Sequence, residues 1–287
     1  MATIQEIKRR ILAIKSTQKI TRAMQMVAAA KLRRAQENIL KVRPYAIDID
    51  KIIEQVALRT KRDIHPLLKE RENEGKILFA VVTADSGLCG GFNSNIIKTT
   101  RSYIDEHSGE DMDLFCIGRK GRDFFTKNNF NVVGDKVMFF NKLKYADSVQ
   151  AISRIKDLFM GGEYKRVDII YNQFKSAIQQ VITTRQLLPL IPAEPEEIVN
   201  PIDYIYEPDE FSILEKLIPY HLEVQMWRIM LESYASEMGA KMTAMDAATE
   251  NAGDLLNTLS ITYNRARQAI ITKEITEIVG GAEALNA

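Results

Sequence analysis

The sequence predicts two long paired helices at the two ends of the chain, with a small doubly wound α/β domain between them. Apolar residues near both termini recur at alternating spacings of three and four, over many more turns than a globular helix needs. The two ends carry opposite net charges, which favours their pairing. The middle of the chain alternates short β-branched runs with amphipathic stretches, the pattern of a sheet covered on both faces.

The first expected helix covers residues 1–60. At a rise of 1.5 Å per residue it would be roughly 80 Å long, which exceeds the size of a compact domain of this mass. Between Thr21 and Met24 two spacings of three follow each other, a stammer that should overwind a supercoil locally. The apolar seam reads Ile4, Ile7, Ile11, Ile14, Gln18, Thr21, Met24, Ala28, Leu32, Ala35, Ile39, Val42, Ala46, Ile49, Ile53, Val56.

The last expected helix covers residues 209–287 and would be roughly 110 Å long. Pro219 falls inside it and Pro44 inside the first helix, so each helix should show a kink or a local break there. The seam reads Leu214, Leu217, His221, Val224, Arg228, Leu231, Ala235, Met238, Met242, Met245, Thr249, Ala252, Leu256, Leu259, Tyr263, Ala266, Ile270.

The middle, residues 76–200, is expected to form a Rossmann-like α/β domain. The buried-strand pattern occurs at 76–83, 112–118, 166–173 and 179–190, and amphipathic helices are predicted at 93–106, 119–127 and 146–160. Strands that alternate with helices indicate a mostly parallel sheet. The Pro-rich stretch IPAEPEEIVNP then connects this domain to the last helix.

Charge is uneven along the chain. Residues 1–60 contain thirteen bases and five acids, a net charge of 13 − 5 = +8, whereas residues 209–287 contain twelve acids and six bases, a net charge of 6 − 12 = −6. The first 36 residues hold nine bases and one acid, so this part stays positive even when paired. A solvated helix face and a specific acidic protein partner explain this excess equally well. Nucleic acid fits poorly, because the bases are interspersed with the seam and no aromatic residues accompany them.

The loop DSGLCGG, residues 85–91, follows the first expected strand, where folds of this class usually bind phosphates. Neither a dinucleotide fingerprint nor a P-loop string occurs, so a tight glycine turn is the favoured interpretation over ligand binding. Cys89 has no motif that would place a base beside it. Cys89 and Cys116 are predicted to be buried free thiols, because they show no metal-ligand spacing with His65, His107 or His221. No catalytic residue, cofactor site or metal site is therefore expected.

The composition is that of a soluble chain: 287 residues, 46% hydrophobic and 27% charged, with a net charge of +1. No run of about eighteen apolar residues is present, so no membrane span is expected. The start MATIQEIKRR lacks the apolar core of a secretory signal, which predicts residence in the cytosol.

Two strings near the termini resemble a known family closely. They are STQKITRAMQMVAAAKLRRAQ, residues 16–36, and YNRARQAIITKEITEIVGGAEAL, residues 263–285. SGLCGGFN, RPYA and MTAMDAATENA match the same pattern, in the right order and over essentially the whole chain. In these strings the sequence resembles the γ subunits of F-type ATP synthases.

The resemblance implies a rotor shaft that catalyses nothing. In this family the N- and C-terminal helices form an antiparallel left-handed coiled coil inside the hexamer of α and β subunits, while the α/β domain contacts ε and the membrane c-ring. Ion flow turns the ring, and the asymmetric shaft drives the β sites through different nucleotide affinities. One copy per complex and a peripheral place at the cytoplasmic face of the bacterial inner membrane, in the F1 sector, are implied as well. The coupling ion that the resemblance implies is the proton, which sodium replaces in some lineages of the family.

Contact residues follow from the aligned strings. Met24 matches a methionine that faces the acidic loop of β, and Arg33 and Arg34 lie on the same segment, where they would contact that loop electrostatically. Ordinary seam packing or helix surface is the alternative for each. Val279–Ala282 would let the tip turn inside a tight sleeve. The C-terminal polar set matched to a second loop of β comprises Arg267, Gln268, Thr272, Glu274 and Glu277.

The chain lacks the inserted segment with a redox-sensitive cysteine pair that chloroplast relatives carry, which favours a bacterial complex. Two other classes of protein remain open. A scaffold built from an α/β module with a coiled-coil arm would use the same heptads. A phosphate-binding enzyme with helical oligomerisation arms would require a ligand at SGLCGG.

Overall fold

The computed structural model describes residues 3–59, 65–71, 75–191 and 210–286. The chain divides into two compact units, each of which takes a part of both long helices. The first unit comprises residues 1–28 and 242–287, and the second comprises residues 29–241. The expected boundaries at 60, 76, 200 and 209 follow secondary structure rather than this division and stay a prediction. The Pro-rich connection falls almost wholly outside the described residues.

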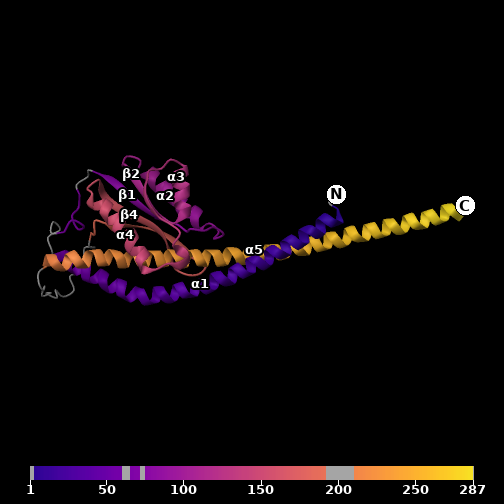
Figure 1. Ribbon diagram of the computed structural model, residues 1–287, viewed down its shortest axis with the longest axis horizontal. Coiled ribbons are helices and arrows are strands. Elements are labelled where there is room, and N and C mark those ends of the chain that lie inside the picture. Colours follow the sequence, from indigo (N-terminus) through magenta and orange to yellow (C-terminus); the bar gives the residue numbers. More distant parts are fainter. Residues whose placement is uncertain (1–2, 60–64, 72–74, 192–209, 287) are drawn as a thin grey trace. The chain divides into compact units, whose positions relative to one another are not determined.

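The two terminal helices are α1, Ile4–Arg59, and α5, Glu210–Asn286. Figure 1 shows each as an uninterrupted helix, α1 in indigo and purple and α5 in orange and yellow. Pro44 and Pro219 lie inside these helices. A kink or a local break was expected at each proline, and neither proline causes a break. The long-helix part of the predicted fold class is confirmed.

The predicted seam of α1 is the buried face of the helix. Ile7, Ala28, Leu32 and Ala35 are at most 5% exposed, whereas the positions between them on the helix, such as Leu12, face solvent. At the stammer both Met24 and its neighbour Gln25 are half-buried, so the seam passes from one residue to the next there. The side chain of Val56 lies outside the described part.

The predicted seam of α5 is correct along most of its length but ends too late. His221, Leu231 and Ala252 are buried, and Ala266 is still half-buried. Ile270, the last predicted seam residue, is 45% exposed. Its prediction as a seam position was wrong because a heptad pattern does not tell where the partner helix stops.

The middle of the chain forms one five-stranded sheet in the order β3-β2-β1-β4-β5. The strands are β1, Lys76–Val82, β2, Met112–Ile117, β3, Val132–Lys136, β4, Tyr164–Phe174, and β5, Gln180–Leu188. β1 pairs in parallel with β2 and β4, β2 pairs in parallel with β3, and β5 is antiparallel to β4. The expected mostly parallel sheet is therefore confirmed.

Three helices accompany the sheet: α2, Phe92–Glu106, α3, Arg119–Lys127, and α4, Tyr145–Met160. All three begin and end within one residue of the predicted bounds. The strand β3 was missed, because its sequence VVGDK contains glycine and aspartate, which are rare in strands. Gly134 is needed there: a Cβ atom at this position would lie 2.7 Å from the ring of Phe115.

Two apolar cores cover the two faces of the sheet, as a doubly wound fold requires. One core packs Phe79, Val81 and Ile170 of the strands against α2 and α3. The other packs the opposite side chains of the same strands against α4 and α5. In this second core Met226 of α5 is fully buried, so in the second unit α5 is part of the domain core as well as part of the long helix pair.

Candidate functional site

The candidate site is the set of residues on α1 and α5 that the sequence predicts to contact partner subunits. The structure divides these residues between the two units. Met24 and the C-terminal polar residues belong to the first unit, while Arg33 and Arg34 belong to the second. They are therefore described unit by unit.

In the first unit α1 and α5 run antiparallel, held by polar contacts at the seam. The hydroxyl groups of Thr21 and Thr249 are 2.7 Å apart. One turn further along α1, Gln25 Nε2 donates to Asp246 Oδ1 over 2.7 Å. Gln18 Nε2 donates to the carbonyl oxygen of Thr249 over 3.4 Å. Since residue numbers rise on α1 as they fall on α5 across these contacts, the pairing is antiparallel.

Met24 lies beside these contacts and is half-buried. Its neighbour Gln25 makes the hydrogen bond to α5, so Met24 is left at the border of the seam. A thioether in such a position can pack on the helix pair and still present part of its surface to a partner. Both the seam-packing and the partner-contact roles remain compatible with this position.

Arg33 and Arg34 are exposed on α1 in the second unit. Arg33 Nε lies 3.3 Å from Glu37 Oε1, and these side chains are 84% and 56% exposed. A pair this exposed, one turn apart on a helix, contributes roughly 0.5 kcal/mol at most. Both arginines therefore remain available for a stronger electrostatic partner.

The C-terminal polar set lies on a part of α5 that extends past the beginning of α1. Thr21 of α1 lies opposite Thr249 of α5. Counting back along α1 and forward along α5 by the same number of residues places Ile4, the first residue of α1, opposite Ala266. Both are half-buried, whereas every residue from Arg267 to Gly281 is exposed. The exposed set comprises Arg267, Gln268, Thr272, Glu274 and Glu277.

Apolar side chains share this unpaired segment. Ile271, Ile275, Ile278 and Val279 are 46–72% exposed. The polar residues there contact only their own helix in the interactions described: Thr276 Oγ1 donates to the carbonyl oxygen of Thr272, and Lys273 forms an exposed ion pair with Glu277. A helix with apolar residues on a solvated surface is typical of a partner-binding segment.

The glycine-rich loop after β1, residues 85–91, is held by hydrogen bonds to the segments that follow β2 and β3. Asp85 is buried, and its carboxylate accepts hydrogen bonds from the backbone N–H groups of Arg119, Met138 and Phe140 over 2.9–3.2 Å. Asn93 Oδ1 accepts a hydrogen bond from the N–H of Ala84. These contacts support the interpretation of the loop as a tight structural turn.

The two cysteines are free and buried, as predicted. Burial raises the pKa of Cys89 and raises that of Cys116 to about 12. Asn93 Nδ2, 3.3 Å from the Cys89 sulfur, is an amide and cannot act as a base. A thiol with a raised pKa is a poor nucleophile at neutral pH.

A polar cluster in the second unit was not predicted as a set. His221 Nε2 and Gln225 Nε2 on α5 both contact Asp50 Oδ1 of α1, at 2.5 and 2.6 Å. Arg228 approaches the other carboxylate oxygen at 3.8 Å. Burial tends to raise the pKa of Asp50, but the hydrogen bond from His221 and the nearby arginine charges outweigh it, and the pKa is lowered. The sequence feature that could have indicated this cluster is His221, a polar residue within an otherwise largely apolar seam.

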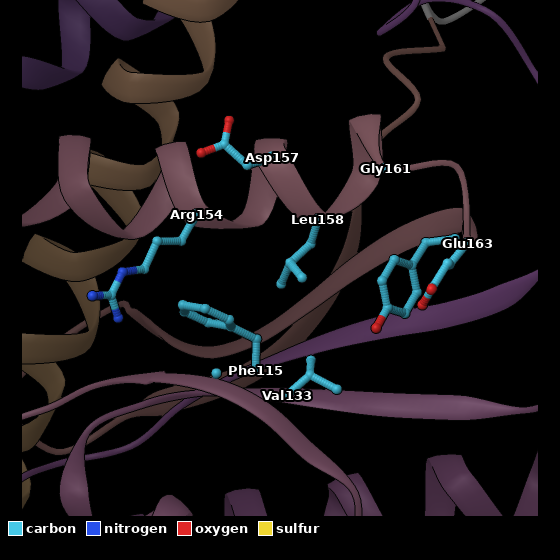
Figure 2. Close-up of a pocket in the computed structure, with 9 residues that line it drawn as sticks. Phe115, Val133, Arg154, Asp157, Leu158, Gly161 and Glu163 are labelled. Carbon is cyan, nitrogen blue, oxygen red and sulfur yellow. The ribbon is translucent and has the colours of Figure 1, made fainter.

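The largest pocket described lies in the second unit between α4 and the sheet, with a volume of about 550 Å³. Figure 2 shows Leu158 of α4 pointing toward Phe115 and Val133 of the sheet, whereas the carboxylate of Asp157 on the same helix points away from them. None of the residues predicted to be functional lines it. Among the described residues, acidic, histidine and cysteine side chains form no group of three that could ligate a metal ion.

Within the described ranges, no helix combines the length and the apolar composition needed to cross a membrane.

Comparison with solved structures shows where this fold is found. The fold resembles the rotor of the Euglena gracilis mitochondrial ATP synthase, with a TM-score of 0.68 and 18% identity over 93% of this chain and 98% of that one. It also resembles the central stalk and c-ring structure from Tetrahymena thermophila, with a TM-score of 0.62 and 21% identity over 80% of this chain and 99% of that one. The fold is thus one found in ATP synthase central stalks.

Sequence comparison gives the family. The family model described as ATP synthase matches residues 3–285. The chain is 44% identical over 300 residues to the ATP synthase gamma chain of Chloroherpeton thalassium and 43% identical over 287 residues to that of Geotalea uraniireducens, with 99% of both chains covered in each case. The chain belongs to the ATP synthase gamma chain family.

Proposed function

We propose that the chain is the central-stalk rotor subunit of an F-type ATP synthase and transmits torque between the membrane ring and the catalytic hexamer. The observation that carries this proposal is the exposed segment Arg267–Gly281, which continues α5 beyond its pairing with α1. An isolated segment of this kind needs a surrounding partner to cover its apolar residues. A hexamer with a central channel provides such a surface.

The partners we propose are the alpha and beta subunits of the hexamer, the epsilon subunit and the membrane c-ring, with one copy of this chain per complex. The chain itself takes no part in the chemistry, since the nucleotide sites belong to the hexamer. It binds no nucleic acid and needs no cofactor. The complex is placed at the cytoplasmic face of a bacterial inner membrane, where this chain is a peripheral subunit of F1.

Two surfaces are proposed to bear on the beta subunits. Met24, Arg33 and Arg34 face an acidic loop of beta, and the basic excess of the first 36 residues attracts that loop. Arg267, Gln268, Thr272, Glu274 and Glu277 contact a second loop. A shaft that presents different side chains on each face lets the three beta subunits meet different surfaces and can hold them in different states.

A phosphate-binding enzyme is the weaker reading of the same chain. The Asp85 carboxylate accepts a hydrogen bond from the backbone N–H of Arg119, and the Asn93 amide accepts one from the N–H of Ala84 and donates one to the carbonyl oxygen of Ser86, so these polar groups are engaged within the protein. A carboxylate within this loop also repels a phosphate. Titration of the full chain with ATP or inorganic phosphate tests this alternative, and specific binding at the loop supports it.

The proposed function is tested by assembling the full chain with alpha and beta subunits and attaching a visible probe to the stalk. ATP should drive unidirectional rotation of the probe, and omission of this chain should abolish it. A chain truncated before Arg267 is the informative comparison, because it keeps the described pairing with α1. Equal torque from the full and the truncated chain argues against a role of the exposed segment.

A further inference from the structure

The glycine-rich loop touches α5 through a partly buried polar contact that the proposed beta-binding surfaces do not include. Ser86 of the loop donates through Oγ to Glu237 Oε1 over 3.1 Å. Lys241 Nζ donates to Ser86 Oγ and to Glu237 Oε1, each over 2.8 Å. We name Ser86, Glu237 and Lys241 the loop clamp. It closes a triangle between the end of β1 and one turn of α5.

The charged members of the loop clamp are largely withdrawn from solvent. The side chains of Glu237 and Lys241 are 4% and 14% exposed. Burying an ion pair contributes little to stability, because desolvation of both charges offsets their attraction. The best-attested use of such a pair is to fix one arrangement of two packed elements among several of similar energy. The loop clamp therefore specifies a position of the loop on α5.

Two further contacts of the α/β domain involve the same turn of α5. Gly239 allows close approach of the turn between β4 and β5, since a Cβ atom there would lie 2.9 Å from the carbonyl oxygen of Ala177. Ala240 packs against a small cluster that contains Cys89 and Phe92. Two loops of the α/β domain, the glycine-rich loop after β1 and the turn between β4 and β5, thus contact residues 237–241 of α5.

The position of these contacts along the chain gives them mechanical significance. Lys241 is the last residue of the second unit, and α5 continues without a break into the first unit. A twist applied to the α/β domain reaches the rest of α5 through this turn. Hydrogen bonds of fixed direction between the loop and this turn add resistance to sliding and rotation beyond that of the apolar packing.

We propose that Ser86, Glu237 and Lys241 are positioning residues that transmit torque from the α/β domain to α5. This inference rests on the proposed rotor function. In it, the SGLCGG loop provides a polar attachment of the domain to α5, in addition to the apolar core, in the place where other folds of this class hold a phosphate.

The test measures torsional stiffness in the complete complex. The hexamer is fixed to a surface and stalled with a non-hydrolysable ATP analogue, and a probe on the membrane ring reports the angular variance of the stalled rotor. Ser86→Ala is the first variant, since it keeps the Lys241–Glu237 pair and leaves no buried charge alone. Ser94→Ala is the matched control, because Ser94 is exposed and bonds only to the nearby carbonyl oxygen of Gly91.

Ser86→Ala is expected to lose stiffness, seen as a larger angular variance, while its thermal unfolding temperature stays that of the control. Lys241→Met should give the same direction of change. The angular variance of the double variant should not exceed that of the more affected single variant, because both substitutions disrupt the same three-residue contact. Wild-type variance in Ser86→Ala, or simple addition in the double variant, overturns the inference. Failure of the wild-type complex to rotate with ATP overturns the proposed function instead.

Discussion

The imidazole of His221 and the carboxylate of Asp50 join α5 to α1 within the second unit, with 2.5 Å between Nε2 and Oδ1. The His221 side chain is 4% exposed, and that of Asp50 is 28% exposed. Gln225, fully buried, donates to the same carboxylate oxygen. One acidic residue of α1 therefore satisfies two buried polar groups of α5, and this defines a single register of the two helices.

Asp50→Ala should destabilise the full chain by about 1–3 kcal/mol, because it leaves the buried donors of His221 and Gln225 without their acceptor. Denaturant unfolding followed by circular dichroism measures the change. Asp48→Ala is the control, since Asp48 is exposed two residues earlier on the same helix. Equal losses in the two variants would show that Asp50 is ordinary helix surface.

The same carboxylate predicts a dependence of stability on pH. The pKa of Asp50 is lowered in the folded chain, against the effect of burial, by the His221 hydrogen bond and the charges of Arg228 and Arg185. A lowered folded pKa gives stability that is present above the unfolded pKa, about 3.9, and is lost as pH falls through the folded value. The free energies of unfolding of wild type and of Asp50→Asn should therefore begin to converge as the pH falls below about 4. A constant gap down to pH 2 would contradict this.

Gly118→Ala should be among the most damaging single substitutions in the α/β domain. Gly118 has φ 99°, and a Cβ atom there would lie 2.0 Å from the carbonyl oxygen of Thr83. A clash with backbone combined with a left-handed conformation should cost about 3 kcal/mol or more. Gly109→Ala provides the comparison, because a Cβ atom at Gly109 meets nothing within 4 Å. Thermal unfolding of both variants decides the prediction.

Met24→Lys should weaken coupling between ATP hydrolysis and ion pumping more than it weakens folding. Met24 is half-buried at the border of the seam, so a lysine can extend toward solvent at little cost, while its charge alters the proposed contact with beta. Membrane vesicles with the complete complex and a potential-sensitive dye report pumping per ATP whichever ion is used. Met26→Lys places the same charge at a 61% exposed methionine. Unchanged pumping in Met24→Lys removes the contact role.

Arg267→Ala should leave the stability of the free chain unchanged and slow ATP-driven rotation in the complex. Arg267 is exposed on the unpaired part of α5, and exposed substitutions of this kind usually change stability by no more than about 0.5 kcal/mol. Arg265→Ala, also exposed and two residues earlier, is the matched control. If both variants rotate like wild type, Arg267 makes no functional contact in the hexamer.

The sequence was sufficient for the features that depend on local pattern. The seam of α1 from Ile7 to Ile53 and the bounds of α2, α3 and α4 follow from helical periodicity and are as predicted. β1 and β2 were recognisable as continuous apolar runs, which buried parallel strands require.

Features that depend on long-range register were not predictable in this way. The Asp50–His221 pair joins residues far apart in sequence, and the exposure of Ile270 depends on where α1 begins opposite α5. β3 is held by its pairing with β2 although Gly134 and Asp135 disfavour a strand. The contacts proposed for Met24 and Arg267 involve other chains and stay predictions.

Because α1 begins opposite Ala266, the part of α5 beyond that residue is a single helix, and this affects its mechanics. A lone α-helix bends much more easily than two helices packed side by side, so the stretch from Arg267 onward is the compliant end of an otherwise stiff element. Such an end can follow an uneven surface by bending, while twist is borne where the helices are doubled. Lengthening α1 by a few turns at its beginning would trade that compliance for rigidity.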